Sequence, residues 1–280
     1  MNALIWTPHF DASCLALLPK VRANGFDGFE VPFFEPSKVA ATEIRRALSE
    51  NGLECHGCCL LPERLSPISE DSGVRRKTCD HLRECVRVTA EMGARLMGGP
   101  IYAPVGYLPG RRRTEDEWKW AVECLQSLGD VLDSCGVTLA IEPLNRFETY
   151  FLNTAADAGR LCDEVAHPRI GVLLDTFHTN IEEKDVAAAF QAMGGRLKHI
   201  HACENDRGIP GTGHVDFPGI GRALREIRYD GWLTIESFGF QFKELAAAAA
   251  IWRDLAPSPE TIAFDGLRYL KPAITAAARA

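Results

Sequence analysis

Residues 172–183 read VLLDTFHTNIEE: an apolar run ends directly in Asp175, and His178 follows three positions later. With the two residues before it, the run forms IGVLLDT (170–176), which has the length and apolar character of a buried β-strand. A strand is a rigid element, so an acidic side chain at its end has a fixed place. We expect His178 to lie on the following loop and to reach over the same end of the strand. The stretch therefore predicts a functional site at a strand end.

Seven further strand-like stretches alternate with helical patterns along the chain. They are NALIW (2–6), GFEVPF (28–33), LECHGCCL (53–60), RLMGGP (95–100), TLAIEPL (138–144), LKHIHACE (197–204) and WLTIESF (232–238). Strands that alternate with helices indicate parallel pairing through crossover helices, and eight such units in about 250 residues are typical of a closed barrel. We therefore expect an α/β fold, a single (β/α)8 TIM barrel in one domain that covers residues 1–280.

Helix signals and one missing motif support this prediction. Ser37 precedes the helical pattern KVAATEIRRALSE, and a capping box of Thr114 and Glu117 opens a long helix that we expect to end near Gly136. The main alternative is an open doubly wound sheet, which usually has a Gly-rich turn after its first strand. No such turn follows Trp6, so the barrel is the better prediction.

Composition and charge exclude several classes of function. The chain has 280 residues, of which 46% are hydrophobic, and 38 acidic against 31 basic residues give a net charge of −7. This charge disfavours broad electrostatic binding, so we expect neither nucleic acid nor a membrane as a partner. The first residues, MNALIWTPHF, lack the regions of a signal peptide, and no stretch is long enough to span a membrane. We expect a soluble, cytoplasmic protein.

The ten cysteines are scattered through apolar runs, which favours buried free thiols over disulfides or a zinc site. Cys55 and Cys58 have CxxC spacing, but on a strand their side chains would point to opposite faces. They could not hold one metal ion from there.

Four consecutive predicted strands end in a side chain that can bind metal. These residues are Glu142, Asp175, His201 and Glu236. In a parallel barrel these strand ends converge on one mouth, where active sites lie. Three carboxylates and one imidazole fit Mn²⁺, Mg²⁺ or Co²⁺ better than a structural zinc site. Crowded carboxylates would also repel one another unless a cation lay between them.

Each of these residues has an ordinary structural alternative. A single Glu at a strand end is usually a helix cap, an ion-pair partner or a solvated charge. The coincidence on four successive strands favours a site. His199 lies two positions before His201 and on the same face of a regular strand. We expect His199 to pack in the barrel or to support a ligand, not to bind metal itself.

Four motifs resemble those of a known family. EPLNRFETYFLNT, LDTFHTNIEE, HIHACENDRGIPGTG and TIES are similar to the motifs of ketose 3-epimerases of the D-tagatose 3-epimerase and D-psicose 3-epimerase type. These enzymes belong to the TIM-barrel superfamily of xylose isomerase and endonuclease IV. The resemblance covers the whole chain and is specific from about residue 138 onward. It implies C3 epimerisation of a free ketose, and a homodimer or homotetramer.

The resemblance also implies roles for individual residues. The family's metal, commonly Mn²⁺, is held at positions that correspond to Glu142, Asp175, His201 and Glu236. The family's substrate contacts correspond to Glu148, His178 and Arg207. Inverting a carbon next to a ketone needs a base on one face and an acid on the other, and Glu142 and Glu236 are the expected pair, acting through an enediolate. The alternative for Arg207 is an exposed loop charge without a role.

The first half of the chain matches this family only loosely. Trp6 and Phe34 stand in for its sugar-contacting aromatic residues, and Glu30 or Glu35 for a further Glu, so the motifs leave the choice of sugar open. The Gly-rich stretch 208–217, GIPGTGHVDF, could accept a phosphate, but it contains no lysine. We therefore expect an unphosphorylated sugar.

Other functions use the same kind of barrel. Hydroxypyruvate isomerase, keto-inositol isomerase or inosose dehydratase would reuse the metal site for a different reaction. A nuclease similar to endonuclease IV would need a trinuclear zinc cluster, with more His ligands than these strands provide, and the acidic charge opposes DNA binding. An inactive barrel that only binds a ligand is the last alternative. The NRFE and NIEE segments favour an epimerase by resemblance.

Overall fold

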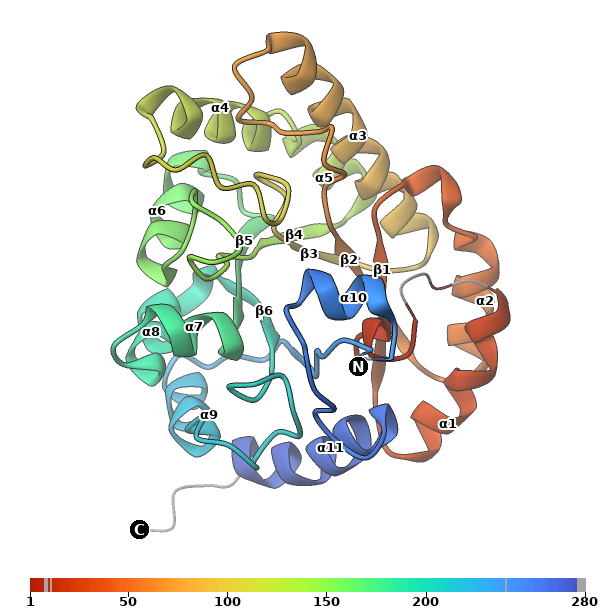
Figure 1. The fold of residues 1–280 in the computed structure, drawn as a ribbon. Helices are drawn as coiled ribbons and strands as arrows, with labels where there is room; N and C mark the ends of the chain where they lie inside the picture. Colours follow the sequence, from red (N-terminus) through yellow and green to blue (C-terminus); the bar gives the residue numbers. More distant parts are fainter. Residues whose placement is uncertain (8–9, 11, 240, 276–280) are drawn as a thin grey trace.

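The computed structural model shows strands at the centre of the molecule and helices around them (Figure 1). It describes residues 1–7, 10, 12–239 and 241–275. Within these residues seven strands form one parallel sheet, in which each strand pairs with the next along the chain. This order, with helical crossovers, is the order of a TIM barrel. The predicted fold class is confirmed.

The strands are β1 (Gly28–Phe33), β2 (Glu54–Cys59), β3 (Leu96–Gly99), β4 (Thr138–Ile141), β5 (Ile170–Asp175), β6 (Leu197–His201) and β7 (Trp232–Thr234). The α-helices are α1 (Leu17–Ala23), α2 (Ala41–Glu50), α3 (Ser72–Glu91), α4 (Glu115–Gln126), α5 (Gly129–Cys135), α6 (Ala155–Val165), α7 (Thr176–Glu182), α8 (Val186–Met193), α9 (Phe217–Glu226), α10 (Lys243–Ala248) and α11 (Pro259–Thr275). Short 3-10 helices are η1 (Ala3–Ile5), η2 (Ala12–Ala16), η3 (Pro36–Lys38) and η4 (Gly194–Arg196). None of the helices described combines the length and apolar character needed to cross a bilayer.

The strand predicted at residues 2–6 is wrong, because this segment forms η1. Asn2 starts the 3-10 helix, since its side-chain oxygen accepts the backbone N–H two residues ahead at 2.9 Å. An Asn side chain thus offers the backbone a local alternative to strand pairing. Asn2 still closes the barrel: its N–H donates to the carbonyl of Ile235 at 3.0 Å, and it forms a parallel bridge with Glu30 of β1.

One helix start and the continuity of one helix differ from the prediction, and one motif is confirmed. The capping box is present, because Thr114 and Glu117 each accept the other's backbone N–H through their side chains. The long helix that it opens is divided into α4 and α5 around Ser127, whose hydroxyl donates to the backbone of the preceding turn. The helix predicted after Ser37 begins only at Ala41, because η3 forms a separate turn before it.

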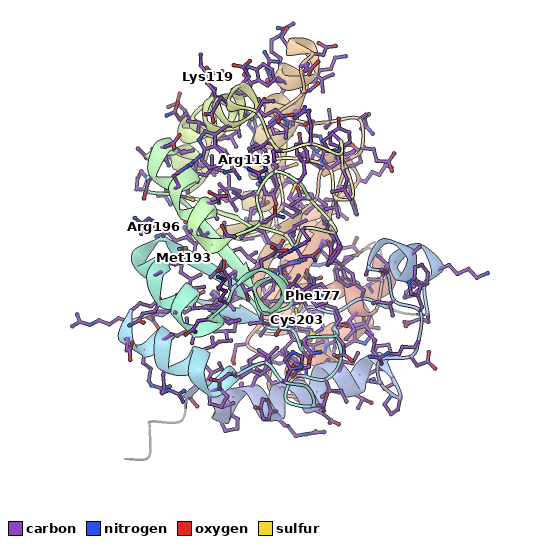
Figure 2. The ribbon with its side chains drawn as sticks, turned by 60° about the vertical axis from the view of Figure 1, so that its left-hand side comes forward. Arg113, Lys119, Phe177, Met193, Arg196 and Cys203 are labelled. Atoms are coloured by element: carbon purple, nitrogen blue, oxygen red, sulfur yellow. The ribbon has the colours of Figure 1, made fainter. Side chains whose placement is uncertain are left out.

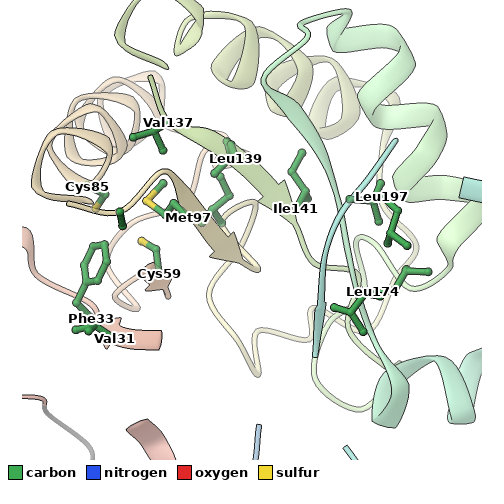
Figure 3. Close-up of a cluster of buried hydrophobic side chains, with 14 of the residues drawn as sticks. Val31, Phe33, Cys59, Cys85, Met97, Val137, Leu139, Ile141, Leu174 and Leu197 are labelled. Atoms are coloured by element: carbon green, nitrogen blue, oxygen red, sulfur yellow. The ribbon is translucent and has the colours of Figure 1, made fainter. Parts of the chain in front are cut away.

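Side chains alternate along each strand between the barrel interior and the surrounding helices. Figure 3 shows part of the outer layer, in which Cys59 packs near Cys85 of α3. A second, smaller cluster consists of Leu96, Ala140 and Leu173. Because strand side chains repeat every two residues, Asp175 follows this inner cluster on the interior face, at the end of β5.

Candidate metal centre

The structure brings four predicted side chains together at the C-terminal ends of the strands. In strand order they are Glu142, Asp175, His201 and Glu236. One ligand atom from each lies within 4.8 Å of the others, and all four residues are buried. Carboxylates and an imidazole at these separations can hold one divalent cation.

The two ring nitrogens of His201 have different surroundings. Nε2 lies 2.9 Å from Glu30 Oε1, and because a carboxylate only accepts, this nitrogen carries a proton. Nδ1 lies 3.3 Å from Glu236 Oε2 and 3.6 Å from Glu142 Oε1. It is buried and has no hydrogen-bond partner among the described residues. This nitrogen, aimed into the cluster, fits a metal ligand.

The buried carboxylates of the cluster need a positive charge beside them. Burial raises the pKa of Glu142 to about 7. Burial acts in the same direction on Glu236, but the charges of His201 and Arg207 outweigh it and hold the Glu236 pKa below its ordinary value. Burial lowers the pKa of His201, but carboxylates, foremost Glu236 and Glu30, raise it well above its ordinary value. A cation or a proton within the cluster therefore stabilises it.

Arg207 supplies one positive charge. Its Nη1 lies 2.6 Å from Asp175 Oδ2 and 3.1 Å from Glu236 Oε2. The residue is 4% exposed, which rules out the alternative of an exposed loop charge. Its guanidinium lies over the Phe177 ring, 4.4 Å from the centroid, and its Nη1 lies 2.7 Å from Cys203 Sγ. Figure 2 shows Phe177 and Cys203 close together at this end of the molecule.

His178 lies in α7 and not on a loop as predicted. Asp175 caps this helix, because its Oδ1 accepts the N–H of Phe177 at 2.6 Å, and the helix begins directly after the strand. His178 Nδ1 accepts the backbone N–H of Asn145 at 3.2 Å, and Nε2 lies 3.3 Å from Arg207 Nη2 and 3.8 Å from Glu142 Oε1. Burial lowers the pKa of His178 to about 3. His178 is therefore a neutral ring beside the cluster, between the N–H donors of Asn145 and Arg207.

Asn145 was not assigned a role from the sequence, yet it organises the loop after β4. Its side-chain amide donates to Glu148 Oε1 at 2.8 Å and lies 2.9 Å from His178 Nδ1. Burial raises the pKa of Glu148. In the same loop Arg146 pairs with Glu182 of α7 at 3.0 Å. The NRFE and NIEE segments are therefore in direct contact. Asn145 is the first residue of the NRFE motif, and this motif is the sequence signal from which a role for Asn145 could be predicted.

A cavity of about 600 Å³ lies beside the cluster. Polar groups on its lining include Glu142, Glu148, His178, Arg207 and Glu236. Its apolar wall includes Phe34, Leu61, Pro104, Phe147, Phe177 and Phe238. Such a cavity, apolar with a few convergent polar groups, is typical of a small-molecule site.

The loosely matched residues of the first half have different positions. Phe34 lines this cavity, as expected of a residue that contacts substrate. Trp6 instead stacks on Phe29, with 6.4 Å between the ring centroids. Glu35 pairs with Arg64 away from the cluster, whereas Glu30 is buried and contacts His201.

The Gly-rich loop after β6 binds a carboxylate of the chain itself. Glu204 Oε2 accepts the N–H of Gly211 at 2.8 Å, and its Oε1 accepts the N–H of Val215 at 3.0 Å. Gly213 approaches the same carboxylate so closely that a Cβ there would lie 2.5 Å from Oε1. Backbone amides that a phosphate would use are thus already occupied.

Comparison with known proteins agrees with this geometry. The family model described as "Xylose isomerase-like TIM barrel" matches residues 18–273. A probable ketose 3-epimerase of Synechocystis sp. is 36% identical over 97% of this chain and 94% of its own length. The L-ribulose 3-epimerase of a Methylomonas strain is 31% identical over 96% of this chain and 95% of its own length. A solved structure of D-allulose 3-epimerase from Methylomonas sp. in complex with D-allulose superposes with a TM-score of 0.91 at 30% identity, over 97% of this chain and 95% of that one.

Proposed function

Because the chain belongs to the xylose isomerase-like TIM-barrel family, we propose that it is a metal-dependent epimerase that inverts C3 of an unphosphorylated ketose. The observation that carries this proposal is the convergence of four metal-ligating groups at the strand ends. Relatives named as ketose 3-epimerases are similar over nearly the whole chain, which supports sugar epimerisation. The family resemblance of the sequence motifs is confirmed.

The residues that would hold the metal are Glu142, Asp175, His201 and Glu236. The orphaned Nδ1 of His201 supports this assignment, because it lacks any other partner among the residues described. Three oxygen ligands and one nitrogen favour Mn²⁺, with Mg²⁺ or Co²⁺ as alternatives. Once bound, the ion would act as a Lewis acid on the oxygens next to the reacting carbon.

Two glutamates carry the proposed proton transfers. Glu142 and Glu236 come from different strands, and both reach His201 Nδ1, at 3.6 and 3.3 Å. One takes the proton from C3, so that the electron pair of the C–H bond moves toward the neighbouring carbonyl and gives an enediolate. The other returns a proton to the opposite face, which restores the ketone with C3 inverted.

Two further side chains would stabilise charge on the substrate oxygens. Arg207 has a permanent positive charge, and the N–H of Asn145 on Nδ1 of His178 turns Nε2 toward the cluster, 3.3 Å from Arg207 Nη2. Prearranged donors of this kind lower the energy of a developing oxyanion. Glu148, at the edge of the cavity, would bind a hydroxyl group of the sugar.

Charge around the cavity favours a sugar without phosphate. Arg207 is the only cationic side chain among the described residues that line it, and two carboxylates already engage it. Glu63 and Glu148 add negative charge to the lining. The amides of the Gly-rich loop are occupied by Glu204, as described above. A phosphate dianion would therefore find repulsion and few donors.

A product assay tests the proposal. The Mn²⁺-loaded protein is incubated with a panel of free ketopentoses and ketohexoses, and products are separated by chromatography. We expect the C3 epimer of at least one ketose, and a much slower reaction with the corresponding ketose phosphate. Formation of an aldose or of a dehydrated product would replace the epimerase with an aldose–ketose isomerase or a dehydratase.

A further inference from the structure

A buried hydrogen-bond network lies next to the candidate metal cluster. Its centre is Glu30 of β1, which is 1% exposed. The carboxylate accepts from His199 Nε2 at 2.7 Å, from His201 Nε2 at 2.9 Å and from the side-chain amide of Asn2 at 2.7 Å. One buried carboxylate thus holds three donors, two from β6 and one from Asn2 near the start of the chain.

Asn2 connects this network to Glu236. Its Nδ2 donates to Glu30 Oε1 and also lies 3.0 Å from Glu236 Oε1. The orientation of the amide is fixed, because its Oδ1 accepts the backbone N–H of Leu4. The backbone of Asn2 is fixed as well, through its contacts with β1 and with Ile235.

Asn2 and Glu30 each hold one atom of a cluster residue by a hydrogen bond, so that a second atom of that residue faces the cluster. Glu236 Oε1 is anchored by Asn2, and Oε2 then faces His201 Nδ1 at 3.3 Å and Arg207 Nη1 at 3.1 Å. His201 Nε2 is anchored by Glu30, and Nδ1 then faces the cluster. Neither Asn2 nor Glu30 lines the cavity, so neither would touch substrate.

We propose that Asn2 and Glu30 form a positioning pair: Glu30 holds His201 with Nδ1 toward the metal, and Asn2 holds Glu236 with Oε2 toward metal and substrate. This inference rests on the proposed function for the identity of the metal and the reaction. A carboxylate that accepts the outer N–H of a metal-binding His fixes its tautomer and orientation. The amide of Asn2 extends this control from a ligand to a proton-transferring group.

The first test is Glu30→Gln, with metal affinity measured by isothermal titration calorimetry without substrate. Gln keeps the size of Glu but turns one acceptor into a donor, so at least one of the three N–H groups loses its partner. We expect Mn²⁺ to bind about 10- to 100-fold more weakly. An unchanged Mn²⁺ affinity in a variant that is merely less stable would show that Glu30 has a structural role alone.

The second test compares two substitutions of Asn2. Asn2→Asp keeps the size and the acceptor for Leu4, but places an oxygen against the carboxylates of Glu30 and Glu236. Asn2→Ala removes the side chain. If the amide positions Glu236, kcat falls at least about tenfold in both variants, with KM changed less than twofold and with the larger loss for Asp. A space-filling role instead gives near-parent kcat for Asp and a loss only for Ala.

Asn24→Asp is the matched control, because the side chain of Asn24 is exposed and donates to the carbonyl of Lys20. It should leave kcat and metal affinity unchanged. Failure of the proposed epimerase function can be distinguished from failure of the Asn2–Glu30 positioning pair, because metal affinity is measured by calorimetry without substrate. If no ketose is epimerised but Glu30→Gln weakens Mn²⁺ binding, the reaction is wrong and the role of Glu30 stands. If the parent epimerises ketoses and the Glu30 and Asn2 variants match it in affinity and kcat, the positioning pair is wrong.

Discussion

At the scale of single residues, Glu142 and Glu236 are proposed both to bind metal and to transfer protons. Glu142→Gln and Glu236→Gln keep the shape and one metal-capable oxygen but cannot accept or return a proton. We expect each change to lower kcat by about 10²- to 10⁴-fold, the usual contribution of a general acid or base. Metal content, measured by elemental analysis, should stay substantial. Near-parent turnover in either variant would contradict the two-glutamate mechanism.

A second residue, far from the cluster, has a distinct chemistry of its own. A hydrogen bond from Cys124 lowers the pKa of Cys79 to about 7, against the effect of burial, with help from Ser127 and Arg83. Because the thiolate is the reactive form, its fraction rises as pH rises through this value. The rate of alkylation of Cys79 should therefore increase with a midpoint near pH 7 in a peptide-mapping experiment.

The control for this prediction is Cys79→Ser, which should remove the alkylation phase with that midpoint. Cys135→Ser is the matched control, because Cys135 is also a partly exposed free cysteine. This substitution should leave the alkylation phase with a midpoint near pH 7 intact. A Cys79 that labels only above pH 8.5, the range of an ordinary thiol, would contradict the lowered pKa.

At the scale of elements, one residue at the junction of β5 and α7 both caps a helix and belongs to the candidate metal cluster. Asp175 caps α7 through Oδ1 and faces the cluster through Oδ2. Asp175→Asn separates these functions, because Asn caps helices as well as Asp but carries no charge. We expect α7 to keep its cap and the metal content to fall sharply. Unchanged metal content by elemental analysis would show that the proposed ligand set is wrong.

Sequence patterns predicted those elements that form by local rules. Apolar runs located β1 to β7, and the side-chain spacing of Thr114 and Glu117 located the start of α4. The prediction of a strand at residues 2–6 is wrong because the Asn2 side chain accepts the backbone N–H of Leu4. No hydrophobic pattern reveals such a local hydrogen bond. His178 lies in a helix and not on the predicted loop, because Asp175 caps α7. An interpretation of Asp175 as a metal ligand alone does not include this capping role.

The same limit applies to the site. The four residues of the cluster could be predicted because each lies at the end of a strand or just beyond it, and parallel strands of a barrel share one mouth. Asn2 and Glu30 could not be found in this way. Asn2 is 234 residues from Glu236, and only the closure of the barrel brings them within hydrogen-bond distance. Asn145 was within reach of sequence reasoning, because it lies three positions before Glu148.

At the scale of the whole molecule, we expect the buried acidic cluster to make the free energy of unfolding depend on metal. Three carboxylates held together without a cation destabilise the folded state, and a ligand that binds only the folded state stabilises it by mass action. Mn²⁺ at 100 times its Kd should stabilise the protein by about 2.7 kcal/mol. Calorimetric melting after chelation and after Mn²⁺ is restored measures this. A melting temperature that does not respond to either treatment would contradict a resident metal.

The central claim is that this barrel inverts C3 of a ketose by proton transfer, and isotope exchange in D₂O tests it most directly. The Mn²⁺-loaded protein is incubated in D₂O with a ketose that it converts, and the product is analysed by NMR. Because a carboxylate exchanges its proton with solvent, we predict deuterium at C3 of the epimer, and no epimer after chelation. An epimer that forms with its original hydrogen still at C3 would contradict the claim.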